Sequence, residues 1–374
     1  MKSKKPMSPS KRDLIAILRS IVCCDGTPIP SDANWPALWS LAQRNHLEAI
    51  IYKAMPVDIA APLEDDYYYY VIRSGQQELL LEQIEQALTK ADIHYALQKG
   101  SLLRGDYPKV QLRFLTDMDF YIRSEDRGAI RAAMLSIGGA PKGGDSGDEQ
   151  FLFEGGLGVE FHGRLLYRKT KRGIENYPDW QFVNEQTNRL TEEGFVLNLI
   201  GHAVGDLAKG GPGIRYILDL WVYRHRHMPQ PDWDAVWDRL KADGIDAAAK
   251  NLLDLSEYLF GDGEETDLLK EMAEYVLEGG LYGDSKRGAA AETARSGSKC
   301  RAMIRQVLRN RTEYENRYPW LKRYPFLLPV AWVMRVWRSF HSNGKAIKEW
   351  RNGMRSVQKD EVKKQKERLT RFGL

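Results

Sequence analysis

The chain has 374 residues, which is enough for two compact units or for one domain with large additions. Hydrophobic residues make up 43% of it and aromatic residues 10%, so it can bury a substantial core, and wholesale disorder is excluded. The net charge of +4 is small for this length and argues neither for nor against a nucleic-acid partner.

The cellular compartment is predicted from the cysteines and the apolar runs. Cys23, Cys24 and Cys300 are too few and too irregularly spaced for a disulfide framework or a four-ligand zinc site, which indicates a reducing compartment. The N-terminal segment is basic, but Arg19 interrupts its apolar stretch, so we expect a helix there and not a signal peptide. No run reaches the roughly 18 apolar residues needed to span a bilayer. We therefore expect a cytoplasmic protein.

Residues 1–90 are predicted to form an N-terminal helical region. Apolar residues recur at helical spacing in two or three segments between residues 11 and 55. A longer helix is expected over residues 62–93, with a buried side made of Val71, Leu79, Ile84 and Leu88. Four consecutive tyrosines at 67–70 spread around such a helix, so we expect packing with partial exposure there and not a ligand site.

The pattern becomes strand-like over residues 91–170. A strand at 93–99 leads into Gly100-Ser101 and a short helical turn, and a second strand covers residues 117–122. A helix is expected over 124–139, with Ser124 as its N-cap and Gly138 near its end. Two further strands in 149–166 flank a glycine-rich turn, which indicates a hairpin. This small mixed sheet covered by helices is the candidate catalytic core.

The remainder is predicted to be mostly helical. Residues 171–278 form a helical domain that supports the substrate or nucleotide, with a Gly-Pro-Gly loop between its first two helices. Residues 279–300 are rich in Gly, Ala and Ser and are expected to be a flexible loop. Residues 301–374 comprise C-terminal helices, the apolar segment 324–334 and a basic tail from Lys345 to Arg371. We expect the apolar segment to dock onto the protein itself, and the basic tail leaves contact with a membrane surface open.

Asp117 and Asp119 are the first candidate site residues. In a strand they point to the same face, so their carboxylates are set roughly 6 to 7 Å apart. Two like charges this close favour a divalent cation between them. Glu160, on the second strand of the hairpin, reaches the same cation if that strand lies beside residues 117–122. The alternatives are a solvated strand end or a capping pair for the aspartates and an exposed carboxylate for Glu160.

Gly100-Ser101 fits the same scheme. A Gly-Ser pair between a strand and a helix lets the backbone approach a phosphate closely. Lys99 and Arg113 add positive charge beside a triphosphate. Three carboxylates suit one or two Mg²⁺ ions, with Mn²⁺ as a substitute, so these parts predict a phosphoryl-transfer site.

The order of Gly-Ser, "DMD" and a single acid on a later strand resembles the nucleotidyltransferase fold of the DNA polymerase beta superfamily. The longer segments "LQKGSLLRGDYPKVQLRFLTDMDFYI", "VEFHGRL" and "HAVGDLAKGGPGIRYILDL" are similar to an uncharacterised bacterial nucleotidyltransferase family, over roughly residues 35 to 225. The resemblance implies an α+β core with helical N- and C-terminal additions. It also implies that Gly100 and Ser101 form the phosphate loop, Asp117 and Asp119 the metal pair, and Glu160 the third acid.

The resemblance also implies a reaction. An acceptor oxygen attacks the α-phosphorus of a nucleoside triphosphate, ATP among the candidates, and pyrophosphate is released. The acceptor is left open between a sugar phosphate, a peptide or protein side chain and an RNA end. Two other classes remain: a nucleotide-sensing or partner-binding protein without turnover, and a membrane-surface protein of a polysaccharide or peptide-modification pathway.

Further charged residues have two interpretations each. Arg215 and Asp219 are spaced for an intrahelical ion pair, whereas the family resemblance suggests that Arg215 faces the nucleotide. His202 and Lys209 carry the same ambiguity, with Lys209 the better phosphate candidate because of its loop position. His162 is either a ligand or substrate contact, or a partnered structural histidine. His225 and His227 are expected to be exposed and not to bind metal.

Overall fold

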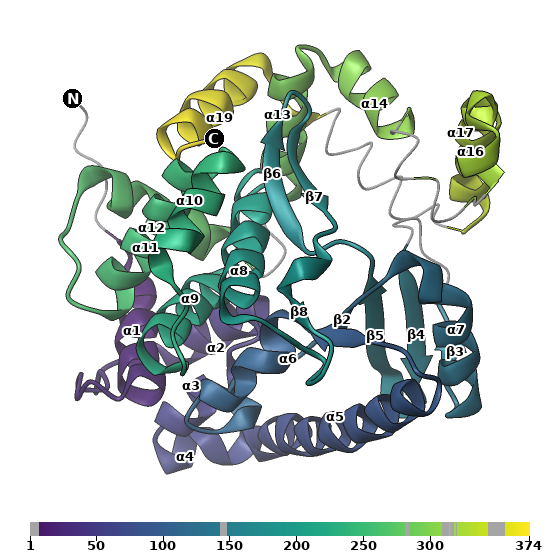
Figure 1. Cartoon of the computed structure of the whole chain (residues 1–374). Coiled ribbons are helices and arrows are strands. Elements are labelled where there is room, and N and C mark those ends of the chain that lie inside the picture. The colour runs from purple at the N-terminus through teal and green to yellow at the C-terminus, as the bar shows by residue number, and fades with distance from the viewer. Residues whose placement is uncertain are drawn as a thin grey trace.

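The computed structural model describes residues 7–142, 148–280, 284–308, 320–342 and 356–374, together with Tyr314 and Tyr318. Its N-terminal part is helical, as predicted. Three helices occupy the first segment: α1 (Pro9–Leu18), α2 (Trp35–Asn45) and α3 (Glu48–Ala54). The short α4 (Val57–Ala60) then leads to the 27-residue α5 (Glu64–Lys90), which runs along the lower side of the molecule in Figure 1.

The buried side of α5 differs from the prediction at one position. Leu80, Ile84 and Leu88 are buried at a spacing of four, whereas Leu79 is 64% exposed. Consecutive helical residues lie about 100° apart, so Leu79 and Leu80 cannot share one narrow stripe. Among the tyrosines, positions 67 and 70 are buried and 68 and 69 are exposed, which confirms packing with partial exposure.

The predicted mixed sheet is present. Its strand order is β1-β2-β5-β4-β3, and only β2 and β5 are parallel neighbours. The strands are β1 (Tyr95–Leu97), β2 (Asp117–Ile122), β3 (Ala140–Pro141), β4 (Glu149–Phe153) and β5 (Leu157–His162). The hairpin turn between β4 and β5 uses Gly155 and Gly156, both at positive φ, and Arg73 of α5 donates hydrogen bonds to both of their carbonyl groups.

The two faces of this sheet have different roles. Phe120, Ile122 and Phe161 pack on one face against α5 and against α7 (Arg127–Ser136). Side chains alternate along a strand, so Asp119 and Glu160 lie on the opposite face. The sequence placed the N-cap of α7 at Ser124, which is wrong: a 3₁₀ turn covers Ser124–Asp126, and Asp126 is the N-cap.

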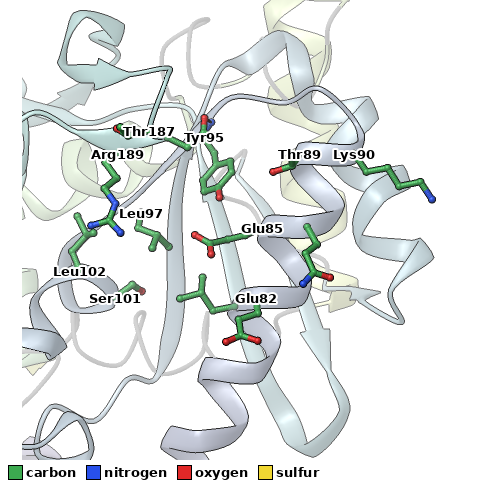
Figure 2. Close-up of a pocket in the computed structure, with 13 residues that line it drawn as sticks. Glu82, Glu85, Thr89, Lys90, Tyr95, Leu97, Ser101, Leu102, Thr187 and Arg189 are labelled. Carbon is green, nitrogen blue, oxygen red and sulfur yellow. Dashed lines mark hydrogen bonds between the residues drawn. The ribbon is translucent and has the colours of Figure 1, made fainter.

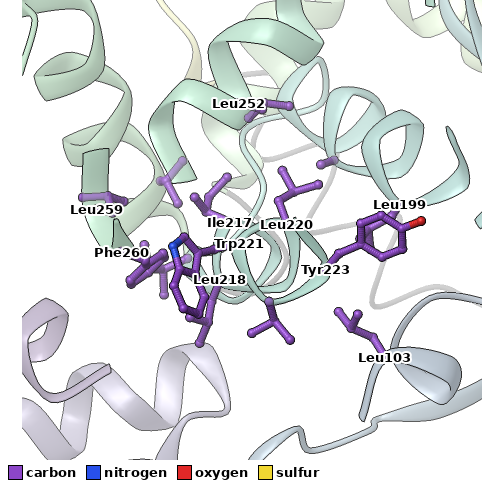
Figure 3. Close-up of a cluster of buried hydrophobic side chains, with 14 of the residues drawn as sticks. Leu103, Leu199, Ile217, Leu218, Leu220, Trp221, Tyr223, Leu252, Leu259 and Phe260 are labelled. Atoms are coloured by element: carbon purple, nitrogen blue, oxygen red, sulfur yellow. The ribbon is translucent and has the colours of Figure 1, made fainter. Parts of the chain in front are cut away.

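A helical body follows the sheet. Its five helices confirm the predicted pattern, and they are α8 (Glu192–Leu207), α9 (Ile214–Arg226), α10 (Trp233–Ala242), α11 (Asp246–Phe260) and α12 (Asp267–Gly279). Leu103, from α6 (Lys99–Leu103), belongs to the same buried cluster as Leu218 and Trp221 of α9, and Figure 3 shows it on the side of Tyr223. The segment that follows β1 is therefore held by the helical body.

Two small antiparallel pairs were not predicted. They are β6 (Leu166–Thr170) with β7 (Gly173–Tyr177), and β8 (Val183–Asn184) with β9 (Arg189–Leu190). Figure 1 shows the β6-β7 ribbon beside α8. It carries Tyr167 against α8, where a Cβ at Gly201 would lie only 2.7 Å from the tyrosine ring.

The C-terminal part corrects two expectations. The flexible loop predicted over 279–300 contains a helix, α13 (Ser285–Ser296), because its alanines at 289–291 are buried; α14 (Lys299–Val307) follows. The end of the basic tail is also a docked helix, α19 (Lys359–Arg371), where Lys286 pairs with Glu361 at 2.6 Å and Phe372 is fully buried. Lys345, and the other tail residues up to Arg355, lie outside the described residues.

Two helices remain at the right edge of Figure 1, α16 (Trp320–Arg323) and α17 (Leu328–Ser342). Ala331 is buried in a cluster with Tyr314, Tyr318 and Leu321, so α17 does dock onto its own chain with one face, as expected. None of the helices in the described part of the chain is long and apolar enough to cross a membrane.

Candidate active site

Asp119 and Glu160 lie side by side on neighbouring parallel strands. The register of β2 and β5 pairs Asp117 with Gly158 and Asp119 with Glu160, so the three carboxylates share one face of the sheet. Gly158 adds no side chain to this face. The sequence predicted this meeting only on the condition that β5 lies beside β2, and that condition is met.

His162 joins this group. Ligand atoms of Asp119, Glu160 and His162 all lie within 4.8 Å of one another. The Nε2 atom of His162 is 2.6 Å from Oδ1 of Asp119, and its Nδ1 atom is 3.4 Å from Asp148. Two carboxylates and one imidazole bind Mg²⁺ less well than three carboxylates do, because Mg²⁺ prefers oxygen ligands, whereas Mn²⁺ also accepts imidazole nitrogen. His162 is therefore partnered and stands at the candidate metal position, and its role as a ligand or substrate contact stays a prediction.

The carboxylates titrate differently because their neighbours differ. Burial raises the pKa of Asp117, and the nearby charge of Asp119 raises it further. Burial and the charge of Asp117 likewise raise the pKa of Glu160. Burial also opposes the charged form of Asp119, but Lys99 and His162 outweigh it and hold its pKa well below the usual range. Asp119 is the fixed negative charge of the site.

His162 is the corresponding cation. Burial works against its protonation, but hydrogen bonds to Asp119 and Asp148 outweigh this effect and raise its pKa to about 9. The imidazole is therefore protonated at neutral pH in the metal-free protein. A metal ion bound to Asp119 would compete with this proton, so metal binding and deprotonation of His162 are linked.

The segment after β1 brings the predicted phosphate loop to the same place. Lys99 is at a positive φ of 48°, and its Nζ atom lies 3.0 Å from Oδ1 of Asp119. A Cβ at Gly100 would come within 2.8 Å of Leu115 and 2.9 Å of Arg113, so only glycine fits there without a shift. The hydroxyl of Ser101 is buried and has no hydrogen-bond partner among the residues that the structure describes. A buried hydroxyl of this kind is unusual and suits a ligand or water contact.

Arg113 has a different partner from the predicted one. Its Nε and Nη2 atoms each lie 2.7 Å from a carboxylate oxygen of Asp219, and the hydroxyl of Tyr107 donates to the same carboxylate at 2.7 Å. Arg113 and Asp219 are both buried. The guanidinium is therefore committed to joining the core to α9, and the expected contact with a triphosphate is corrected to a positioning role.

The interpretation of Arg215 and Asp219 as an intrahelical ion pair is wrong for the same reason. Asp219 accepts its bonds from Arg113, and Arg215 instead donates from Nη1 to the carbonyl of Phe114 at 2.9 Å. Burial and the nearby Arg113 charge lower the pKa of Arg215 to about 10. Lys209, by contrast, is exposed just after α8, as its loop position predicted.

Tyr167 and Tyr216, which were not predicted from the sequence, border the site together with His202. His202 stacks on Tyr216, with ring centroids 5.2 Å apart, and Tyr167 meets His202 edge-on at 6.0 Å. The charge of Lys99 acts on all three rings, which places them near the Lys99-Asp119 pair. Burial lowers the pKa of His202 to about 4, so this ring is neutral. The available signal was the Gly201 and Gly205 spacing, which makes room for Tyr167 on α8.

The two histidines at the end of α9 differ in exposure. His225 is exposed, as expected, with its Nε2 atom 2.9 Å from Glu257. His227 is largely buried and bridges Asp106 and Glu192, at 2.7 and 2.9 Å, so the expectation of exposure is wrong for it.

A cleft with a volume of about 880 Å³ lies between α5 and β1 (Figure 2). Tyr95 and Leu97 line it, together with Glu85, Arg189 and Ser101. Tyr95 belongs to the face of the sheet that packs on α5, so this cleft is not centred on the carboxylates. The turn after β1 therefore touches both regions, because Lys99 contacts Asp119 whereas Ser101 lines the cleft.

A small mixed sheet that presents carboxylates beside a Gly-Ser turn is the arrangement expected of a nucleotidyltransferase. Comparison with protein families agrees: residues 31–261 match a family described as uncharacterised nucleotidyltransferase. The chain belongs to this family and is a transferase of phosphorus-containing groups. No curated protein and no solved structure matched the chain.

Proposed function

We propose that the protein is a Mg²⁺-dependent nucleotidyltransferase with a polymerase-beta-like core. An acceptor hydroxyl or phosphate oxygen attacks the α-phosphorus of a nucleoside triphosphate, a new P–O bond forms, and the bond to the departing pyrophosphate breaks. The proposal rests on one observation, the alignment of Asp119 with Glu160 on parallel strands with Asp117 on the same face. ATP is the first nucleotide to test, and Mn²⁺ is the expected substitute metal.

The three carboxylates would hold the metal. Asp117, Asp119 and Glu160 supply hard oxygen ligands, and a bound Mg²⁺ would neutralise phosphate charge and polarise the α-phosphorus. Glu160 has a raised pKa, which suits a group that accepts the proton of the acceptor hydroxyl. Gln150 donates to its Oε1 atom at 2.8 Å and holds the carboxylate in place.

Other residues would bind the triphosphate. Lys99 and Lys209 supply positive charge, and Gly100 with Ser101 allows close backbone approach at the start of α6. Arg113 and Arg215 are assigned to holding the loop before β2 against α9. Acceptors that fit this chemistry are a sugar phosphate, a peptide or protein side chain, and an RNA end.

Transfer is tested by incubating the protein with each α-³²P-labelled nucleoside triphosphate, Mg²⁺ or Mn²⁺, and a cell extract. Label should appear in an acceptor while pyrophosphate is released, and Asp119→Asn should abolish both. Asp238→Asn is the matched control, because Asp238 is 80% exposed on α10, and it should be fully active. Mg²⁺-dependent nucleotide binding without label transfer to any acceptor would instead assign the protein to nucleotide sensing.

A further inference from the structure

Helix α17 is apolar on two faces. One face is covered, since Ala331 is fully buried and Leu328 and Trp332 pack on the cluster that contains Tyr314. Arg335 belongs to this side too, because its guanidinium lies 5.9 Å from the ring centre of Tyr314. These contacts fix how the helix is turned toward its own chain.

The second face is open to solvent. Val330, Val333, Met334 and Trp337 are 47%, 69%, 38% and 65% exposed. Their spacing of three, one and three residues confines them to a stripe about 100° wide. Phe326, 73% exposed, precedes the same helix by less than a turn. Scattered single apolar residues on a surface are normal, whereas a continuous stripe of this kind marks an interaction site.

The sequence around this stripe carries charge of one sign. Residues 316–348 contain no aspartate or glutamate and seven basic residues, which are Arg317, Lys322, Arg323, Arg335, Arg338, Lys345 and Lys348. In a two-fold contact the same patch meets itself, so the exposed Lys322 and Arg323 of one copy would be brought toward those of the other. This charge disfavours a second copy of the chain and favours an anionic partner.

We propose that this face of α17 binds the surface of an anionic lipid bilayer. Valine, methionine and tryptophan on one face of a helix, with the exposed Lys322 and Arg323 on the preceding α16, are the composition that inserts into the boundary between headgroups and acyl chains. The basic residues add attraction to anionic lipids. With 15 residues, α17 is only about 22 Å long, so it lies in the interface and does not cross the bilayer.

The position of α17 agrees with this orientation. Figure 1 shows α16 and α17 at the edge of the molecule, on the side away from α1 and α4. Within the described residues, α17 packs with α14 and with the 3₁₀ turn Pro325–Leu327. The rest of the protein can therefore stay in water while the helix lies on a membrane.

Sedimentation with vesicles tests the proposal. The full-length protein should bind vesicles of phosphatidylcholine with phosphatidylglycerol, bind phosphatidylcholine alone more weakly, and lose binding as salt rises. Val333→Glu removes an inserted side chain and adds repulsion, so it should lower partitioning about tenfold or more. Leu79→Glu is the matched control, with 64% exposure on α5, and it should bind like the parent protein.

Three results would overturn the proposal. The first is equal sedimentation with charged and neutral vesicles, and the second is equal weakening by Val333→Glu and Leu79→Glu. The third is a concentration-dependent dimer that Val333→Glu abolishes in size-exclusion chromatography, which assigns the face to a second copy. Val333 is 69% exposed, so the variant should keep the parent melting temperature; Met334→Glu, on the same stripe, repeats the test independently.

Discussion

Asp117 and Asp119 lie two residues apart on one strand, yet their surroundings give them opposite energetic roles. The only hydrogen bond found for the Asp117 side chain in the described structure comes from Thr116, and burial and a like charge raise its pKa. Asp119 is bonded to Lys99 and His162, and its pKa is lowered. The negative charge of Asp119 is therefore compensated by neighbouring cations, whereas that of Asp117 is poorly compensated.

This asymmetry predicts that the substitutions Asp117→Asn and Asp119→Asn have different effects on the free energy of unfolding. Asp117→Asn removes a poorly compensated charge, so the free energy of unfolding should stay equal or rise. Asp119→Asn leaves Lys99 and His162 without their buried partner, so it should cost about 1 to 3 kcal/mol. Both should abolish nucleotide transfer. Denaturant unfolding without metal measures the difference, and equal destabilisation by both variants would show that Asp117 is also a structural partner.

At the scale of elements, Arg113 and Asp219 join the segment before β2 to α9. Removing either partner leaves a buried charge, so Arg113→Met or Asp219→Leu alone should cost about 3 to 5 kcal/mol. The double variant should cost less than the sum, with a coupling of more than about 1 kcal/mol. The control cycle is Lys250 with Asp254, an exposed pair on α11, where about 0.3 to 0.5 kcal/mol is expected. If the losses in the free energy of unfolding at Arg113 and Asp219 were additive, the ion pair would not join the segment before β2 to α9.

His227, at the end of α9, pairs with two carboxylates from other parts of the chain. One is Asp106, which follows α6, and the other is Glu192, at the start of α8. Burial opposes its charge, but the two carboxylates outweigh burial and raise its pKa. A raised pKa contributes stability that is complete below the unfolded value of about 6.5 and is lost as pH rises through the folded value. The stability difference between parent and His227→Gln should therefore shrink above about pH 6.5. Denaturant titrations from acid to alkaline pH measure it, and Glu192→Gln should flatten the profile.

The sequence predicted what local pattern determines. The period of α5, the alternation in β2 and the Gly-Gly turn before β5 each follow from neighbouring residues, and together they predicted the face that carries Asp119 and Glu160. Long-range partners were not predictable in this way. Arg113 and Asp219 are 106 residues apart, and the positive charge of Arg113 suits a phosphate as well as a carboxylate. The alanines of α13 were predicted to lie in a flexible loop, because the neighbouring sequence does not indicate that α19 covers them.

At the scale of the whole molecule, residues 356–374 of the basic tail are part of the folded structure. Gln365 donates to the hydroxyl of Tyr275 at 2.7 Å, and Arg368 and Arg371 both pair with Glu271 of α12. Phe372 meets the ring of Tyr275 at 5.3 Å. A Cβ at Gly373 would lie 2.5 Å from the backbone of Ala248, so the chain end is pressed against α11. The last helix thus closes the helical body.

This closure predicts that a residue far from the carboxylates controls global stability. Phe372→Ala removes a fully buried ring, so unfolding should become easier by about 3 to 5 kcal/mol, whereas Lys363→Ala on the exposed side of α19 should change it by less than about 0.5 kcal/mol. Because Phe372 packs on Tyr275 and is not among the residues proposed to hold the metal or the triphosphate, the Mg²⁺-nucleotide affinity of the remaining folded Phe372→Ala protein should equal that of the parent. Differential scanning calorimetry gives the first quantity and isothermal titration below the transition gives the second. A parent-like melting temperature for Phe372→Ala would mean that α19 is detached in solution, and its lysines and arginines would then again be available to anionic partners.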